Sequence, residues 1–101
     1  MDFQIAASDD HASVSLSGQF TFTDAAKFRQ LVDTLLAGSH AAISLDFANV
    51  TFIDSAGMGM LLLLRDECQS QKVPITIKAA QGQVEKVFFI SKFDQLFSMP
   101  T

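Results

Sequence analysis

The chain has 101 residues, enough for one domain and too few for two. Hydrophobic residues make up 49% of it and charged residues 18%, a balance that favours a compact core over disorder. The net charge is −4 at pH 7 and no two basic residues are adjacent, which argues against a nucleic acid or an anionic membrane as the main partner.

Two strands are expected at the start of the chain. Phe3 and Ile5 alternate with polar or small residues, and further on Val14 and Leu16 alternate with serines. This alternation is typical of strands with one buried face. The link between them, residues 8–11, is short and polar, so we expect an antiparallel hairpin.

The first helix has the clearest pattern in the sequence. Thr23 is its expected N-cap, Asp24 lies in its first turn, and Gly38 follows its last turn. Just before it, Phe20 and Phe22 are expected to pack the start of the helix against the core. Its apolar face follows helical spacing through Phe28, Leu31, Val32, Leu35 and Leu36.

Strands and helices alternate over the rest of the chain. We expect a third strand at residues 43–47, a return to the core at 50–53, and a second helix from about Ser55 to Gln71. A fourth strand at 73–77 and a third helix around 84–88 follow, and residues 91–99 suit a last turn that packs Phe93, Leu96 and Phe97. One face of the second helix carries Gly57, Met60, Leu61, Leu64 and Cys68.

This order of elements predicts the architecture. A strand, a helix and a strand across residues 43–78 form a βαβ unit, so those two strands are expected to be parallel with a right-handed crossover. All four strands alternate apolar with polar residues, whereas a sheet covered on both faces would show continuous apolar runs. We therefore expect an α/β fold with a mixed sheet of about four to five strands and helices mainly on one face, in one domain over residues 1–101.

Metal ligands are sparse in the sequence. His11 and His40 have no histidine or cysteine at ligand spacing, and the lone Cys68 falls in the middle of a predicted helix. Asp9 and Asp10 lack the spaced pattern of a calcium loop and are interpreted as a solvated turn. We expect no metal and no cofactor.

The sequence also bears on where the protein works. One cysteine forms no internal disulfide, which suits a reducing cytoplasm, and the acidic start MDFQIAASDD does not resemble a signal peptide. The longest apolar run, residues 56–64 with the glycines counted, is about half a membrane span. We expect a cytoplasmic protein that does not insert into a membrane.

Asp54 and Ser55 stand where a predicted strand passes into a predicted helix. Both are good N-cap residues, so a capping role is the simplest for either. A phosphoryl group at this point would meet free backbone N–H groups and the positive end of the helix dipole, so the position also suits a switch. A hydrolase nucleophile is disfavoured, because the bulky Ile53 stands where that motif needs a small residue and both histidines come earlier in the chain.

The block after Ser55 is apolar on all sides for nearly two turns. A one-sided core cannot bury it entirely, so one or two residues near its start are expected at the surface, with Met58 the best candidate. An exposed methionine beside a switchable serine suits a protein-binding patch, and coverage by neighbouring loops is the alternative. Gly57 and Gly59 begin like a dinucleotide motif, but its third glycine would fall at Leu62, so a packing role is assigned to both.

The segment from Leu45 to Gly59, LDFANVTFIDSAGMG, resembles the signature of STAS domains, in particular bacterial anti-sigma factor antagonists. The resemblance covers nearly the whole chain, including Gly18, the βαβ unit and the pattern Val-x-x-Val-Phe…Phe-Asp-x-Leu-Phe at residues 84–97. It implies the STAS fold, with the order β-β-α-β-α-β-α and a possible last short helix.

The resemblance also implies a mechanism. Ser55 would be the phosphorylation site of a regulator that is not an enzyme, and the unphosphorylated protein would bind an anti-sigma factor, often a serine kinase with a histidine-kinase-like ATPase fold. Phosphorylation would break that complex, and a metal-dependent serine phosphatase would restore it. The protein would be a monomer or a weak dimer. The expected partner-binding residues are Thr21, Thr23, Asp54, Ala56, Gly57, Met58 and Gly59.

The sequence departs from the family pattern at two positions. Thr21 stands where many members have an Asp close to the acceptor serine, and Lys92 stands where a Gly is often found. A second function is compatible with the resemblance: a STAS subunit that supports the ATPase of a lipid-transport ABC complex, in which phosphorylation is not the switch.

Overall fold

A computed structural model describes residues 1–8 and 10–99. Its elements follow the expected order of strands and helices, with one additional 3-10 turn before the first helix. They are β1 (Asp2–Ser8), β2 (His11–Phe20), η1 (Phe22–Asp24), α1 (Ala25–Ala37), β3 (Ala42–Ile53), α2 (Ser55–Ser70), β4 (Ile75–Lys78), α3 (Gly82–Ile90) and η2 (Phe93–Gln95).

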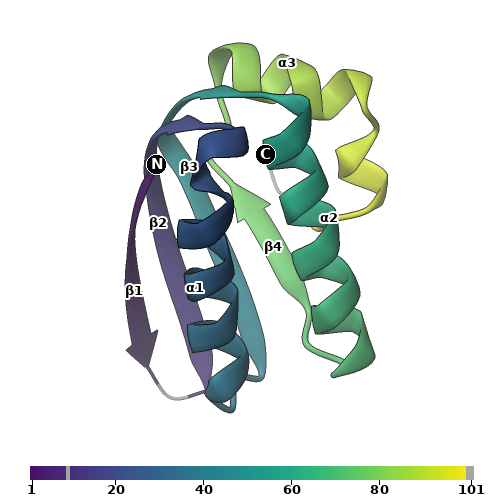
Figure 1. Cartoon of the computed structure of the whole chain (residues 1–101). Coiled ribbons are helices and arrows are strands. Elements are labelled where there is room, and N and C mark those ends of the chain that lie inside the picture. Colours follow the sequence, from purple (N-terminus) through teal and green to yellow (C-terminus); the bar gives the residue numbers. More distant parts are fainter. Residues whose placement is uncertain (9, 100–101) are drawn as a thin grey trace.

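The described strands form one four-stranded sheet in the order β1-β2-β3-β4 (Figure 1). β1 and β2 form the expected antiparallel hairpin, in which Ser8 lies opposite His11; Asp9, which the sequence places in this turn, lies outside the described residues. β3 is parallel to β2, and β4 is parallel to β3, which confirms the predicted pairing of the βαβ unit.

β3 is longer than expected. The sequence suggested a strand ending at Phe47 and a separate return to the core, but β3 runs unbroken from Ala42 to Ile53. Its register against β2 shifts so that Asp46 pairs with Ser15 and Asn49 with Ser17, and β3 takes up one extra residue there as a bulge. This long strand carries the chain directly to the start of α2.

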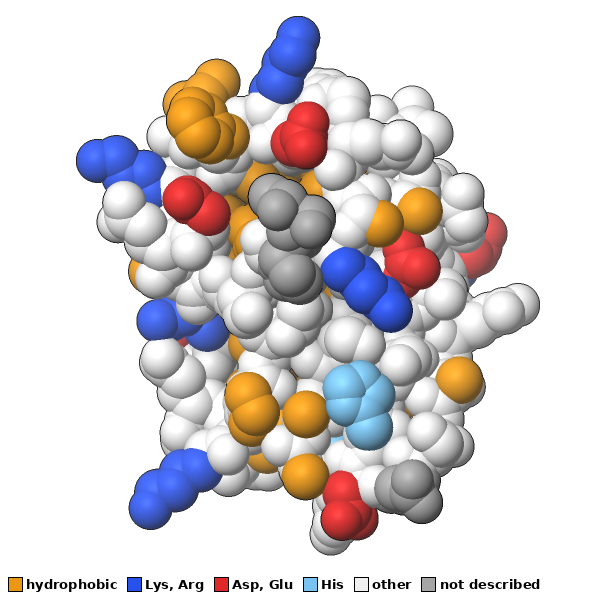
Figure 2. Space-filling view, turned by 180° about the vertical axis from the view of Figure 1, so that it is seen from behind, with side chains coloured by type: hydrophobic (Ala, Val, Ile, Leu, Met, Phe, Trp, Pro, Cys, Tyr) orange, Lys and Arg blue, Asp and Glu red, His pale blue; other side chains and the backbone are white. Residues whose placement is uncertain are grey.

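The helices cover mainly one face of the sheet, as expected. In Figure 1, α1 and α2 lie side by side on that face, and α3 lies across the end of the sheet from which α1 and α2 begin. The opposite face carries the polar members of the alternating strands, and from behind the molecule shows scattered rather than continuous apolar side chains (Figure 2). On that face Ser44 is buried, and its Oγ lies 3.2 Å from His11 Nε2 and 3.3 Å from Ser13 Oγ.

The core lies between the sheet and the helices. The predicted faces of α1 and α2 are buried except for Leu36 and Met60, which are half-buried. A row of phenylalanines extends the core beneath α3 and the tail, with ring centroids 5.1–5.4 Å apart; its members are Phe47, Phe88, Phe93 and Phe97. Beyond η2, the N–H of Ile77 donates to the carbonyl of Ser98 at 2.8 Å, so the tail adds a bridge beside β4.

The start of α1 corrects the expectations for Thr23 and Phe22. Because η1 precedes α1, Asp24 and not Thr23 is the N-cap of α1. Phe20 is fully buried, but Phe22 is 70% exposed, since the chain leaves the strand at Phe20 and turns. Gly38 does follow α1, but its φ of −88° and ψ of 160° are extended, so it is not the left-handed cap that glycine usually supplies.

Candidate partner-binding and phosphorylation site

Ser55 is the first residue of α2, and its side chain is exposed. The N-cap is its neighbour Asp54, whose extended backbone has φ −104° and ψ 179°. The carboxylate Oδ1 of Asp54 accepts the N–H of Gly57 at 2.8 Å, so the capping bond comes from Asp54. The structure therefore assigns the cap to Asp54 and leaves the hydroxyl of Ser55 facing outwards at the helix start.

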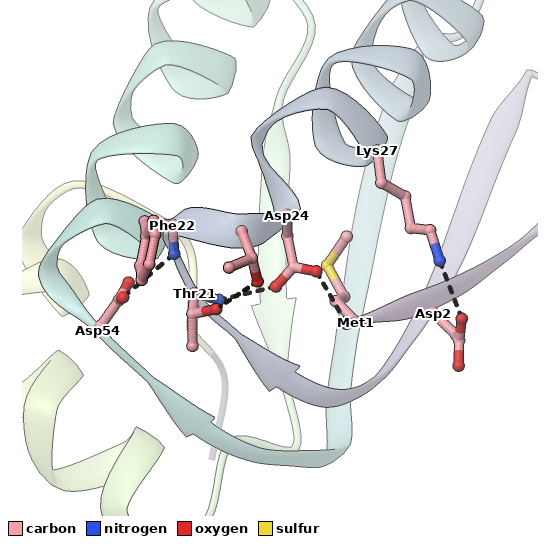
Figure 3. Close-up of polar contacts among 8 residues, drawn as sticks. Met1, Asp2, Thr21, Phe22, Asp24, Lys27 and Asp54 are labelled. Carbon is pink, nitrogen blue, oxygen red and sulfur yellow. Dashed lines mark hydrogen bonds and ion pairs between the residues drawn. The ribbon is translucent and has the colours of Figure 1, made fainter.

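Asp54 also joins the two segments that meet at this end of the sheet. Its second carboxylate oxygen, Oδ2, accepts the N–H of Phe22 at 3.1 Å (Figure 3), and its own N–H donates to the carbonyl of Phe20 at 3.2 Å. One side chain thus satisfies backbone donors of both η1 and α2. The position of η1 beside the start of α2 depends directly on this carboxylate.

A second carboxylate, that of Asp24, organises η1. It is buried, and it accepts the N–H of Thr21 at 2.8 Å and pairs with the α-ammonium group of Met1 at 3.0 Å (Figure 3). Burial raises the pKa of Asp24, but the Thr21 hydrogen bond and then the ammonium group lower it by more, so that the pKa lies below its ordinary value. The hydroxyls of Thr21 and Thr23 are 2.9 Å apart at the same place.

The two glycines of α2 differ. A Cβ on Gly57 would lie 2.7 Å from the carbonyl oxygen of Phe20 and 2.9 Å from Cγ1 of Ile53, so a side chain there would collide with the end of the sheet. The packing role expected for Gly57 is confirmed. A Cβ on Gly59 would meet nothing within 4 Å among the described residues, so the same expectation for Gly59 is wrong.

Gln83 of α3 supports the backbone that precedes Asp54, and nothing in the sequence pointed to it. Its Oε1 accepts the N–H of Ile53 and its Nε2 donates to the carbonyl of Ile53, both at 3.1 Å. Ile53 also pairs with Phe20 of β2. The backbone immediately before Asp54 is therefore held from both sides, and α3 is tied to the start of α2.

The exposed apolar residues near the site are not the expected ones. Met58 is half-buried and packs against the core, whereas Leu63, two turns after the helix start, is 65% exposed. Phe22 is 70% exposed beside Asp54. The apolar block after Ser55 indicated that some residue would be exposed. Which residue this is depends on how α2 is rotated about its own axis.

The site thus unites two parts of the sequence. The fold brings Thr21, Thr23 and Asp54 together at one end of the sheet, beside the exposed Ser55. Along the first turns of α2, Gly57 is buried, and the remaining expected partner-binding residues are half-buried: Ala56, Met58 and Gly59.

The part of the chain that the structure describes also bears on two other kinds of site, a metal centre and a membrane span. No group of three or more His, Cys, Asp or Glu side chains there is arranged to hold a metal ion. None of the helices in this part is both long enough and apolar enough to cross a membrane. Cys68 is fully buried, and this burial, followed by the charge of Glu67, raises the pKa of its thiol.

Comparison with known proteins assigns this geometry to a family. The family model described as "Mlab, STAS domain" matches residues 3–99. The chain belongs to the STAS domain family. The resemblance seen in the LDFANVTFIDSAGMG segment is therefore confirmed.

Relatives of this STAS domain include a STAS-domain containing protein of Pseudomonas aeruginosa that is 30% identical over 94 residues, covering 93% of this chain and 92% of the relative. Among solved structures, the unphosphorylated anti-sigma factor antagonist SpoIIAA has a TM-score of 0.82 at 20% identity, covering 99% of this chain and 89% of its own. An anti-sigma factor antagonist of Mycobacterium paratuberculosis has a TM-score of 0.82 at 21% identity, with coverages of 99% and 86%. At this identity the likeness establishes the STAS fold, which these regulators share.

Proposed function

We propose that this STAS domain protein is an anti-sigma factor antagonist that works by partner switching, with Ser55 as the phosphorylated residue. The observation that carries the proposal is the division of roles at the start of α2. Asp54 makes the capping bond to Gly57, so the exposed Ser55 hydroxyl is available for modification without loss of the cap. The Bacillus protein SpoIIAA, which shares the fold, has been solved both unphosphorylated and phosphorylated.

In this proposal the unphosphorylated protein binds an anti-sigma factor, which is also a serine kinase with a histidine-kinase-like ATPase fold. Phosphorylation of Ser55 adds a charge of about −1.5 to −2. The new charge lies beside the carboxylate of Asp54, on a protein whose net charge is already −4. A partner surface packed against Ser55 does not accommodate the bulk and the charge of the phosphoryl group. The partner is therefore released.

The same position explains why the modification would leave the fold intact. Ser55 is at the N-terminus of α2, where the helix dipole favours negative charge, and its side chain is outside the core. A metal-dependent serine phosphatase would then restore the binding form. The protein would act in the cytoplasm as a monomer or weak dimer and would have no enzymatic activity of its own.

Affinity capture from the native organism tests this function, with wild type, Ser55→Ala and Ser55→Asp as bait. We expect wild type and Ser55→Ala to retain one shared partner that Ser55→Asp loses. The captured partner, purified and supplied with ATP, should add one phosphate to wild type. Equal labelling of Ser55→Ala would disprove the assignment of Ser55.

A second candidate is a STAS subunit that supports the ATPase of a lipid-transport ABC complex. Two observations favour it over an antagonist: the matching family model is described by the name Mlab, and Thr21 occupies the place of the acid that many antagonists carry. In the structure the side chain of Thr21 is a hydroxyl that lies 2.9 Å from that of Thr23. Capture of an ABC ATPase equally by wild type and Ser55→Asp would select this candidate.

A further inference from the structure

The two edges of the sheet differ in how they are covered. The β4 edge is four residues long, and the tail bridges it where the N–H of Ile77 donates to the carbonyl of Ser98. The β1 edge is seven residues long, from Asp2 to Ser8, and β1 is the outermost strand of the sheet in Figure 1. In the described part of the chain no strand pairs with its outer side. One edge of the sheet is therefore open to a further strand.

β1 lacks the features by which an open edge commonly avoids other strands. Lysine, proline and bulges are the usual means of blocking such an edge. The sequence of β1, DFQIAAS, contains no lysine, no proline and only one charge, at its first residue. Its register with β2 is continuous from Asp2 to Ser8, without the shifts that occur between β2 and β3. Nothing in the strand itself therefore prevents further pairing.

The register of the hairpin determines which backbone groups of β1 point outwards. Ser8 and His11 face each other across a link of two residues, so they form the hydrogen-bonded pair that closes the hairpin. Hydrogen-bonded and non-hydrogen-bonded pairs alternate along an antiparallel ladder. Phe3, Ile5 and Ala7 therefore stand in non-hydrogen-bonded pairs, and their N–H and C=O groups point away from β2. These groups form a row of donors and acceptors along the open edge.

We propose that β1 pairs with β1 of a second copy of this chain, antiparallel, about a two-fold axis at Ile5. The strand is symmetric about this residue, with three strand residues on either side. In this register Ile5 lies opposite the second copy's Ile5, and Phe3 lies opposite the second copy's Ala7. Each of these pairs exchanges two hydrogen bonds, so every outward N–H and C=O group of the three residues gains a partner. The two four-stranded sheets become one continuous sheet.

The side chains of β1 suit pairing with a second copy. Phe3 and Ile5 share a face with the buried residues of β2 and pack against the core, but they are only half-buried. The proposed register brings apolar side chains of the second copy beside both. Asp2 lies opposite the second copy's Ser8, and its carboxylate already pairs with Lys27 at 3.1 Å. No two like charges of the paired strands therefore stand directly opposite each other.

The proposed pairing closes after two copies. Each chain offers one open edge, and the two-fold axis uses that edge of both chains, so the assembly is a dimer and not a fibre. Because the two β1 strands are antiparallel, the two Ser55 residues lie at opposite ends of the joined sheet. The inference therefore does not rest on the function proposed for Ser55. An interface of one strand edge is small, so the dimer is expected to be weak.

Sedimentation velocity of the purified wild-type protein tests dimer formation. Between about 1 and 500 µM the sedimentation coefficient should rise from that of a monomer to that of a dimer, because a small interface gives micromolar affinity. A monomer over the whole range, or growth beyond the dimer, would overturn the proposal. Since no other protein takes part, this result is independent of what the Ser55 variants capture.

Amide hydrogen exchange at the two ends of this concentration range tests the register. Exchange at Phe3, Ile5 and Ala7 should slow as dimers form, because their N–H groups acquire acceptors. Exchange at Gln4 and Ala6 should change far less, because their N–H groups bond to β2 in the monomer as well. Equal slowing in both sets of residues would contradict pairing through the outer side of β1.

Two double variants test the same register by charge. In the proposed dimer Gln4 lies opposite the second copy's Ala6, and both side chains are exposed, so changes there leave the core intact. Gln4→Lys with Ala6→Glu places opposite charges across from each other and should tighten the dimer by about threefold. Gln4→Lys with Ala6→Lys places like charges there and should weaken it by about tenfold.

Gln69→Lys with Ser70→Lys is the control for net charge. It adds the same two positive charges as the repulsive variant to a chain of net charge −4, at exposed positions at the end of α2. It should leave the affinity of the dimer unchanged. Circular dichroism of each variant in dilute solution separates loss of pairing from loss of folding. Wild-type affinity in the folded repulsive variant, or an equal loss in the control, would overturn the assignment to β1.

Discussion

At the scale of residues, the site depends on two neighbouring side chains with separate tasks. From sequence, either Asp54 or Ser55 suited the N-cap, because both residue types accept backbone N–H groups well. The extended backbone of Asp54 places its carboxylate between Gly57 and Phe22, and the first helical residue, Ser55, faces outwards. The carboxylate of Asp54 therefore makes the structural contacts, and the side chain of Ser55 stays exposed.

Asp54→Ala should destabilise the protein far more than Ser55→Ala. The first change removes the cap of α2 and the acceptor of the Phe22 N–H, which together are worth about 1–3 kcal/mol of unfolding free energy. Ser55→Ala changes an exposed residue, and its effect should stay within about 0.5 kcal/mol. Urea unfolding followed by circular dichroism measures both, and equal destabilisation would show that Ser55 shares the cap.

Asp24 makes stability depend on pH in the acid range. Its pKa lies below the ordinary value in the folded protein, so the folded state favours the ionised form. The resulting stabilisation is fully present above the ordinary carboxyl pKa and is lost as the pH falls through the lower pKa of the folded state. Wild type should thus exceed Asp24→Asn in unfolding free energy by a constant amount from pH 5 to 7, and by less below about pH 4.

The control for this titration is Asp66→Asn, whose side chain is 70% exposed. Its difference from wild type should be small at every pH, because exposed ion pairs contribute little. Urea midpoints measured at half-unit pH intervals would test both variants. A difference between wild type and Asp24→Asn that grows as the pH falls would contradict the assignment of the buried carboxylate.

At the scale of elements, the start of α2 is held by its neighbours on both sides. Gln83 of α3 bonds the N–H and the carbonyl of Ile53, in the manner of an additional strand, while β2 pairs with Ile53 on the other side. Ser55, the proposed phosphorylation site, follows two residues later. Rigid presentation of Ser55 therefore depends on α3, an element far from it in the sequence.

Gln83→Leu should loosen the junction between the end of β3 and the start of α2. The variant leaves the N–H and carbonyl of Ile53 without their partner, at a cost of about 1–3 kcal/mol. Amide hydrogen exchange of Ile53 should accelerate beyond the change in global stability, because the segment opens locally. Lys86→Leu, at an exposed position on the same helix, is the control and should leave that exchange rate unchanged.

Most elements were predictable from sequence because their patterns are local. Helical spacing in α1 and alternation in the strands reflect burial of one face, and the structure buries those faces. The miss at Phe22 arose because its alternation with Phe20 continues the strand pattern, whereas Asp24 accepts the Thr21 N–H and forms a turn. The bond from Gln83 to Ile53 joins residues 30 apart, and no local pattern carries such a contact.

Prediction of the candidate site from sequence has the same limit. The family pattern located Ser55 and its surroundings, but the exposure of Leu63 depends on the rotation of α2 about its own axis. Gly57 and Gly59 are indistinguishable in sequence, and only their neighbours in space separate a glycine that the core requires from one that it does not. Local patterns therefore propose residues for the candidate site, and the packing of the elements decides which of them are buried and which are exposed.

At the scale of the whole molecule, one face of the sheet supports the core and Cys68 lies within that core. Its side chain is fully buried on the inner face of α2, among residues contributed by the sheet and the other helices. A thiol in this position is protected twice: a reagent cannot reach it, and burial raises its pKa so that little thiolate forms at neutral pH. Its reactivity therefore reports on opening of the whole fold.

Modification of Cys68 by a thiol-specific reagent at pH 7.5 should consequently follow unfolding. In buffer the rate should be lower than for unfolded protein by a factor close to the folding equilibrium constant, and it should rise with urea in parallel with the unfolded population. The control is Ser70→Cys in a Cys68→Ser background, because position 70 is exposed on the same helix and should react at the rate of a free thiol. If Cys68 reacts as fast as that control in the absence of urea, the core opens locally at the end of α2 instead.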